Sequence, residues 1–213
     1  MSRQEIVDAL IEHQGQLYSE AIGANFARDT PQELFHWLIG ALMLAARIDS
    51  GLAVAAAAKL REAGLHKIDA ILDADDARLI EVLTDGGYAR YREVTTGYLK
   101  ETAAWARDSF DGDLRVLRDR AEDADALLEA LQGAKGIGPI GAAIFAREAQ
   151  LVWDIFHPRA DGPALDAARD LGLPDDAEAL LKLAGGRERF VRLMAALTRA
   201  ALDGPADAVR AAR

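Results

Sequence analysis

Cysteine is absent from the 213 residues of the chain. This absence excludes disulfide bonds, catalysis by a thiolate, and every zinc site or iron–sulfur cluster that depends on cysteine ligands. Histidine is scarce as well, and His13, His36 and His66 show none of the spacings that metal sites use. We therefore expect neither a transition metal nor a metal cluster.

Long hydrophobic runs are also missing. The longest uncharged apolar run covers residues 34–46, whereas a helix that crosses a bilayer needs about 20 apolar residues. The first six residues, Met-Ser-Arg-Gln-Glu-Ile, contain no apolar core of the kind that signal peptides carry. We expect a cytoplasmic protein with no membrane partner.

Positive charge is in deficit. The chain carries 25 Lys and Arg against 35 Asp and Glu, which gives a formal net charge of −10 at pH 7. Residues 113–170, which hold the most distinctive motif, contain seven basic and eleven acidic residues. Affinity for phosphates grows with the number of cations that contact them, so this balance argues against a broad electrostatic coating of nucleic acid. A local site is still compatible with it.

Strand-like alternation of apolar and polar residues does not occur either. Half of the residues (51%) are hydrophobic, and they recur at the three- and four-residue spacing of helices. The sequence therefore predicts an all-α fold of about ten to twelve helices, forming a single compact unit over residues 1–213. We expect residues 30–153 to form its central part. The C-terminal part, residues 154–203, is expected to pack with N-terminal helices in residues 1–29, and the tail 204–213 to be frayed.

Two helices of the central part have clear sequence signals. Thr-Pro-Gln-Glu at residues 30–33 resembles a capping box around a first-turn proline, and the helix that follows, to about Arg47, is apolar on nearly every side. Such a helix belongs in the middle of a domain. A long helix is predicted over residues 88–110, and we assign the face that carries Tyr91, Tyr98 and Trp105 to the core.

The most distinctive stretch is rich in glycine and covers residues 131–143. Gly-Ile-Gly-Pro-Ile-Gly at residues 136–141 matches the G-x-G-x-x-G pattern of dinucleotide-binding proteins, and Asp161 lies twenty residues further on, where such proteins place an acid. That pattern requires a strand before the first glycine. Here leucines at helical spacing precede it, so the sequence predicts a helix, a glycine hairpin and a second helix within residues 123–153.

Two interpretations of this hairpin stay open. Its glycines let the backbone turn with positive φ and leave amide N–H groups uncovered at the start of the second helix, where a phosphate can approach them and the helix dipole. Alternatively, Gly136 and Gly138 only form a compact turn between two packed helices.

The order of motifs resembles the endonuclease III-like superfamily of base-excision DNA glycosylases. The matching stretches are Leu-Phe-His-Trp-Leu-Ile at residues 34–39 with Asp49, Gly-Gly-Tyr-Ala-Arg-Tyr at 86–91, Phe-Asp-Gly-Asp-Leu at 110–114, the hairpin at 134–139, and Asp161 with Leu-Gly-Leu at 171–173. The resemblance covers about residues 30–203, and the shared order is more specific than any single motif. It implies a helical DNA-glycosylase fold with a helix-hairpin-helix element.

The resemblance also implies a function in base-excision repair on double-stranded DNA. It makes Asp161 the catalytic residue and assigns contacts with the DNA backbone to Lys135, Gly136, Ile137, Gly138 and Ile140. Members that also cleave the strand carry a lysine at the position of Ile140, so we expect hydrolysis of the N-glycosidic bond without a β-lyase step. The glutamine that many members insert into the duplex corresponds to Ala46. No cofactor is implied beyond a monovalent cation at the hairpin.

Asp161 has two interpretations. Its carboxylate can stabilise positive charge on the sugar as the base leaves, or activate water. An aspartate at this place can also simply cap the helix that begins near Pro163. Arg47, Tyr91 and His157 are the candidates for a base pocket. A catalytically inactive fold that binds DNA or a protein partner is the alternative function.

Overall fold

The computed structural model describes residues 2–211. All regular secondary structure in that range is helical, which confirms the predicted all-α class. The range contains fourteen α-helices and two short 3₁₀ helices. This is more than the ten to twelve helices predicted, and the added helices include α14 (Asp207–Ala211), in a segment where the sequence predicts fraying.

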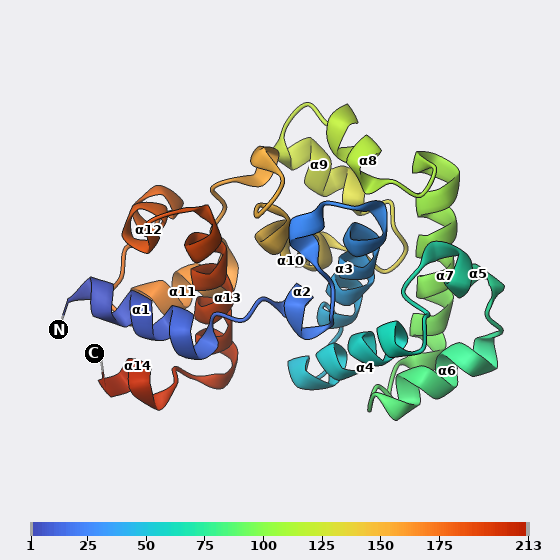
Figure 1. The fold of residues 1–213 in the computed structure, drawn as a ribbon, viewed down its shortest axis with the longest axis horizontal. Coiled ribbons are helices and arrows are strands. Elements are labelled where there is room, and N and C mark those ends of the chain that lie inside the picture. The colour runs from blue at the N-terminus through green and yellow to red at the C-terminus, as the bar shows by residue number, and fades with distance from the viewer. Residues whose placement is uncertain (1, 212–213) are drawn as a thin grey trace. The chain divides into compact units, whose positions relative to one another are not determined.

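The chain forms two compact units (Figure 1). Unit 1 combines Met1–Tyr18 with Ala146–Arg213, the blue and the orange-to-red ends of the colour scale, and unit 2 is the single stretch Ser19–Phe145. The division falls inside one helix, α10 (Pro139–Ala149). No linker marks it in the sequence.

Unit 2 is built around helix α3 (Pro31–Leu44), as the apolar sequence of this helix predicts. Trp37 is fully buried, and its indole Nε1 donates a hydrogen bond to the Phe145 carbonyl oxygen on α10 (3.1 Å). The other elements of the unit are α2 (Tyr18–Ala21), η1 (Phe26–Arg28), α4 (Ser50–Glu62), α5 (Ile68–Asp73), α6 (Asp76–Asp85), α7 (Arg92–Phe110), α8 (Leu114–Arg120) and α9 (Ala124–Leu131). Helices α4 and α6 approach so closely that a Cβ atom at Gly86 would lie 2.4 Å from the Cα atom of Ala56.

The start of α3 differs from the predicted capping box. Thr30 occupies the cap position, but its side chain makes no capping hydrogen bond. Glu33 is buried instead, and its carboxylate accepts two hydrogen bonds from the Arg61 guanidinium (3.0 and 3.1 Å) and one from the Asn25 amide (2.7 Å). The local pattern predicts that Glu33 caps the helix, but its carboxylate instead binds Arg61, which lies 28 residues away in the chain.

Helix α7 begins at Arg92, whereas the sequence predicted a start at residue 88. The backbone turns at Gly87 with a φ of +84°, and the Tyr88 amide donates to the Leu83 carbonyl oxygen (2.9 Å), so this segment closes the end of α6. Tyr88 is buried as a result. Residues 88–91 therefore form a connecting loop that carries two tyrosines.

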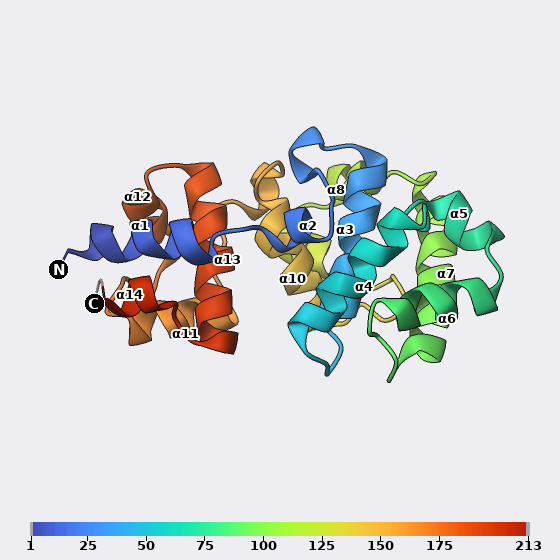
Figure 2. The same ribbon diagram turned by 60° about the horizontal axis from the view of Figure 1, so that its bottom comes forward.

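Unit 1 is centred on helix α13 (Arg187–Asp203). Helices α1 (Arg3–Gln14), α11 (Gly162–Asp170) and α12 (Ala177–Ala184) pack against it, as Figures 1 and 2 show. Val7 and Leu10 of α1 share one apolar core with Phe190 and Leu197 of α13. The remaining elements are η2 (Asp154–Phe156) and α14 (Asp207–Ala211).

The C-terminal tail is helical where the sequence predicted fraying. The Gln14 side chain donates to the Gly204 carbonyl oxygen (3.1 Å) and accepts from the Ala206 amide (2.9 Å), and Val209 of α14 is fully buried. These contacts hold the segment up to residue 211 against α1. The last two residues of the predicted tail, 212 and 213, lie outside the described range.

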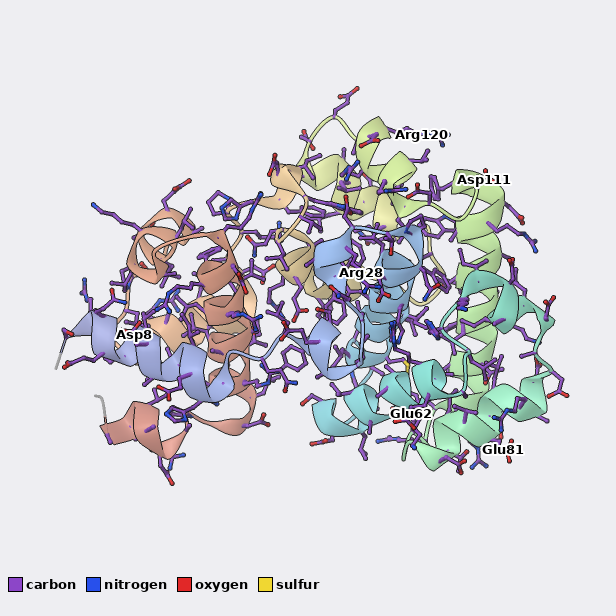
Figure 3. All side chains as sticks on the ribbon, viewed as in Figure 1. Asp8, Arg28, Glu62, Glu81, Asp111 and Arg120 are labelled. Carbon is purple, nitrogen blue, oxygen red and sulfur yellow. The ribbon has the colours of Figure 1, made fainter. Side chains whose placement is uncertain are left out.

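Charged side chains cover the outside of both units (Figure 3). Some form exposed pairs along a helix, such as Lys59 with Glu62 on α4 and Arg78 with Glu81 on α6. No helix within residues 2–211 combines the length and the apolar composition needed to cross a membrane.

Candidate functional site

The glycine hairpin of unit 2 has the predicted form of a helix, a turn and a second helix. Helix α9 ends at Leu131, and α10 begins at Pro139. In the turn between them, the Ala134 amide donates to the Leu131 carbonyl oxygen (3.1 Å), and the Ile137 amide donates to the Ala134 carbonyl oxygen (3.0 Å). Ala134 and Ile137 are buried, so they anchor the hairpin while the residues between and after them face outward.

Two contacts join helix α7 to the hairpin. The Thr102 hydroxyl donates a hydrogen bond to the Lys135 carbonyl oxygen (3.0 Å). Gly136 turns with a φ of +84° and lies so close to the Tyr98 ring that a Cβ atom at this position would be 2.6 Å from Tyr98 Cδ2. Only glycine combines this backbone angle with this close approach.

The hairpin leaves backbone donors open at the start of α10. Among the described residues, no acceptor takes the amide N–H groups of Gly138, Ile140 and Gly141, whereas the Ala142 amide donates to the Gly138 carbonyl oxygen (3.0 Å). Gly138 faces open space, since a Cβ atom there would meet nothing within 4 Å. This arrangement agrees with the first interpretation of the hairpin, in which an anion can reach the amides.

A pocket of about 320 Å³ opens beside the hairpin. It is formed by the end of α3 with the turn after it, by the start of α7 with the loop before it, and by the hairpin. Arg47, Tyr91 and Gly136, three residues selected from the sequence, lie around it together. The full lining is Leu42, Ala45, Ala46, Arg47, Tyr88, Tyr91, Val94, Thr95, Tyr98 and Gly136.

The pocket suits a flat group that is neutral or anionic. Three tyrosine rings contribute to its walls, Arg47 is the only charged residue of its lining, and no carboxylate lines it. A second cation lies at its edge, because the Arg90 guanidinium stacks 5.2 Å from the centre of the Tyr91 ring. Burial raises the pKa of Tyr88, so this phenol stays neutral at physiological pH. Aromatic rings stack on nucleobases, and arginine binds phosphate.

The segments that form most of the pocket contain basic but no acidic residues, although the chain as a whole is acidic. The three segments that build most of it, residues 34–48, 86–92 and 130–145, contain no Asp or Glu. Their cations are Arg47, Arg90, Arg92 and Lys135. The first acid beyond them on α7 is Glu93, which is exposed and does not line the pocket. Asp49 and Asp85 also adjoin these segments and do not line the pocket, so the absence of acids holds for the pocket lining.

The two hairpin glycines should respond differently to substitution. We expect Gly136→Ala to destabilise unit 2 by about 2 kcal/mol, because it forces an alanine into a left-handed backbone conformation and against the Tyr98 ring. Gly138→Ala adds the same methyl group in open space, and we expect it to change the free energy of unfolding by less than about 0.5 kcal/mol. Urea denaturation of both variants measures the difference, and equal effects would contradict the hairpin geometry.

Asp161 lies in unit 1 and does not act as a simple helix cap. It occupies the cap position of α11, but its side chain makes no capping hydrogen bond. Its Oδ1 pairs with Arg147 Nη2 (3.3 Å), and its Oδ2 pairs with Arg159 Nε (3.0 Å). About a fifth of the side chain is exposed. The carboxylate is therefore a partly accessible group held between two guanidinium groups.

Gln150 fixes the loop that carries Asp161. This side chain is fully buried, and its amide donates to the carbonyl oxygens of Arg147 and Arg159 (both 2.9 Å) while its carbonyl oxygen accepts from the Arg159 amide (2.8 Å). Both arginines that pair with Asp161 are thus held by one glutamine. No local pattern in the sequence indicates Gln150 or Arg147, and the only signal for Arg159 is its position two residues before Asp161.

His157, the third candidate for a base pocket, belongs to unit 1 and does not line the pocket beside the hairpin. Its ring packs edge-on against Phe190, with 5.7 Å between the ring centres. Burial lowers the pKa of this imidazole. The ring therefore contributes to the core of unit 1.

Tyr98, Tyr88 and Val94 also line the pocket, although the sequence does not indicate them as site residues. Tyr98 follows Tyr91, the residue before α7, by seven positions, and this spacing predicts a shared helical face in the core. A helical period identifies a shared face, but it does not show whether that face meets another helix or a cavity.

Within residues 2–211, no group of three or more His, Asp or Glu side chains is placed to hold a metal ion. Comparison of the chain with models of protein families, with curated proteins and with solved structures finds no match.

Proposed function

We propose that the chain binds double-stranded DNA through the glycine hairpin and receives one unpaired nucleobase in the pocket beside it. The observation that carries the proposal is the shared position of Arg47, Tyr91 and Gly136 around this pocket. The open amides of Gly138 and Ile140 supply phosphate contacts that do not depend on base sequence. The tyrosine rings supply a surface on which a base can stack.

The proposed reaction is hydrolysis of an N-glycosidic bond in the bound DNA. The resemblance to endonuclease III-like glycosylases gives Asp161 the catalytic role, in which its negative charge stabilises the positive charge that develops on the sugar. No lysine follows the hairpin, because Ile140 and Gly141 occupy the first turn of α10 after Pro139. The proposal therefore includes no Schiff base and no strand cleavage by the protein.

A DNA-binding protein without catalytic activity is the second candidate, and one observation favours it. Both carboxylate oxygens of Asp161 are already engaged by arginine side chains. These guanidinium groups offset the negative charge that hydrolysis requires near the sugar. In this second candidate Asp161 has a purely structural role and fixes the loop that Gln150 also holds.

A single-turnover assay separates the two candidates. Duplexes that each carry one lesion or mismatch are incubated with the wild-type protein, with Asp161→Asn and with Asp166→Asn, which makes the same change at an exposed site on the same helix. For a glycosylase we expect breaks that depend on alkali treatment, at a rate at least about 100-fold lower in Asp161→Asn and unchanged in Asp166→Asn.

Binding measurements complete the test. If the hairpin grips phosphates, Lys135→Ala should reduce the slope of log affinity against log salt concentration by about one. Salt-dependent binding without any break would establish the non-catalytic candidate. Breaks without alkali would contradict the absence of a lyase step. A wild-type protein that binds no duplex at low salt would refute both candidates.

A further inference from the structure

A groove of about 530 Å³ follows one face of helix α11 in unit 1. Four residues of α11 and the residue after it form one wall of this groove, and they recur at the three- and four-residue spacing of a single helical face. They are Pro163, Asp166, Ala167, Asp170 and Leu171. Helix α11 has nine residues, so this face is about 13 Å long and is open along its whole length.

The other wall is the end of α13 with the turn after it. It is formed by Ala200, Ala201, Leu202 and Pro205. Helices α11 and α13 pack side by side (Figure 2), and the alanines of both walls leave room for a close approach between them. Leu202 at the edge has 57% of its surface accessible, and covering this apolar surface is favourable. The groove therefore has the shape of a seat for a third helix on two packed ones.

The lining of the groove is negatively charged. Among the described residues that line it, Asp166 and Asp170 are the only charged ones, and they lie one helical turn apart on α11. Asp166 pairs with Arg169 of the same helix (2.9 Å), and both side chains are more than half exposed. Such a pair contributes little to stability, so a cation of a bound partner can compete for this carboxylate.

The end of α13 adds negative charge to the same groove. Its last turn contains no basic residue. The Gly204 amide donates to none of its carbonyl oxygens, Pro205 has no N–H, and the Ala206 amide donates to a side chain of α1. A helix end without capping donors attracts cations. Arg210 lies near Gly204, but it pairs with Asp207 (3.1 Å) and does not line the groove.

We propose that this groove binds an amphipathic helix of a protein partner, with apolar residues on one face and lysine or arginine along its edge. The apolar residues of that helix cover Ala167, Leu171 and Leu202, and its basic residues face the two aspartates and the end of α13. A nucleic acid does not fit here, because its phosphates would meet carboxylates. The site belongs to unit 1, and the inference does not depend on the proposed DNA binding.

The test measures binding of a designed peptide by fluorescence anisotropy at several salt concentrations. The basic peptide has about 18 residues, enough for a stable helix, with leucines on one face and arginines beside them. One control peptide carries glutamate in place of every arginine. A second control peptide carries serine in place of every leucine. Together they show whether binding needs both the charge and the apolar face.

Two variants remove one feature of the groove each. Asp166→Lys reverses a charge of the lining, and Leu202→Ser removes the exposed apolar side chain. Both positions are exposed, so both variants are expected to fold, which circular dichroism checks. Glu178→Lys reverses an exposed charge on α12 outside the groove, and Leu52→Ser removes an exposed leucine of unit 2, so these two serve as matched controls.

We expect the wild type to bind the basic peptide at least about tenfold more tightly than either control peptide. Asp166→Lys should weaken this binding about tenfold and reduce its salt dependence, because an attraction becomes a repulsion. Leu202→Ser should weaken it about fivefold without changing the salt dependence, as expected when part of one leucine side chain is no longer covered. The two control variants should bind as the wild type does.

A label inside the groove identifies the place of binding. The chain has no cysteine, so Ala201→Cys gives a unique attachment site for a fluorophore in the lining, and its emission should change when the basic peptide binds. A wild type that prefers no peptide would overturn the inference, and so would equal losses in Asp166→Lys and Glu178→Lys, which indicate diffuse attraction to an acidic surface. Emission that changes with protein concentration alone would identify a second copy of the chain as the occupant and would also overturn it.

Discussion

Arg61→Met is expected to lower the free energy of unfolding of unit 2 by about 3 kcal/mol, since removal of one partner leaves a buried carboxylate without its countercharge. The Glu33 side chain is only 5% exposed, and Arg61 binds both of its oxygens. Burial alone raises the pKa of Glu33, but the hydrogen bonds from Arg61 and the Asn25 amide outweigh it and hold the pKa below its ordinary value. The Arg61 side chain is 28% exposed, so solvent screening places the effect at the lower end of what a buried pair shows.

A double variant and a matched control make this prediction specific. Glu33→Gln in the Arg61→Met background removes the unpaired charge, and we expect it to recover more than half of the lost stability. Arg78→Met breaks a pair whose side chains are at least half exposed, and we expect a change below about 0.5 kcal/mol. Tryptophan fluorescence follows the unfolding of unit 2 when all variants also carry Trp153→Phe. The two remaining tryptophans, Trp37 and Trp105, both lie in unit 2. A loss from Arg61→Met no larger than that from Arg78→Met would contradict the buried pair.

Unit 2 is also expected to lose stability as the pH falls from about 6.5 toward 4. His36 is fully buried, and this burial lowers its pKa from 6.5 to about 4. Its ring nitrogens face the Ala57 carbonyl oxygen and Arg61 Nη1 (both 3.2 Å). A neutral ring satisfies both contacts, with Nε2–H donating to the carbonyl and Nδ1 accepting from Arg61. A protonated ring would set its N–H against that of the guanidinium.

The lowered pKa of His36 determines both the direction in which stability changes with pH and the pH range of that change. Between pH 6.5 and 4 the unfolded chain binds a proton at residue 36 that the native unit does not, so stability is full above pH 6.5 and falls with decreasing pH. Down to pH 5, where carboxyl groups contribute little, the expected loss is about 2 kcal/mol from this group alone. Burial also lowers the pKa of His66, the ring next to His36, which adds in the same direction.

Urea denaturation at pH 7, 6 and 5 measures this loss. His36→Gln should flatten the profile, because the amide does not bind a proton in either state. His13→Gln makes the same change on an exposed ring and should keep the wild-type slope. A His36 resonance that titrates near pH 6.5 in the folded protein would show that the ring is not excluded from solvent as described.

The sequence predicted those features that depend on neighbours in the chain. Helix α9 ends at Leu131 and α10 begins at Pro139, so the predicted order of helix, glycine hairpin and helix within residues 123–153 is present. The Asp75 and Asp176 side chains cap helices by accepting hydrogen bonds from amides three residues ahead. In each case the partner lies within one turn, so a local pattern contains the whole interaction.

Features that depend on distant partners could not be predicted in this way. Glu33 forms half of a capping box by spacing, yet Arg61 binds it, and an ion pair across two helices leaves no local signature. Asp161 sits at a helix start but pairs with Arg147 and Arg159. Local patterns do not predict the pocket either, because three separate segments of the chain form it. The sequence marked Arg47 and Tyr91 only through the resemblance, and it assigned Tyr98 to the core.

The composition of unit 1 from two distant segments affects the order in which the chain can fold during synthesis. The apolar face of α1 is synthesised before its main partner α13, which follows about 170 residues later. At typical translation rates this interval lasts roughly 10–35 s. All of unit 2 leaves the ribosome within that time, as one uninterrupted stretch. The earlier of the two segments of unit 1 thus waits for its native neighbours until the later one is made, and for that period its apolar residues are available to chaperones.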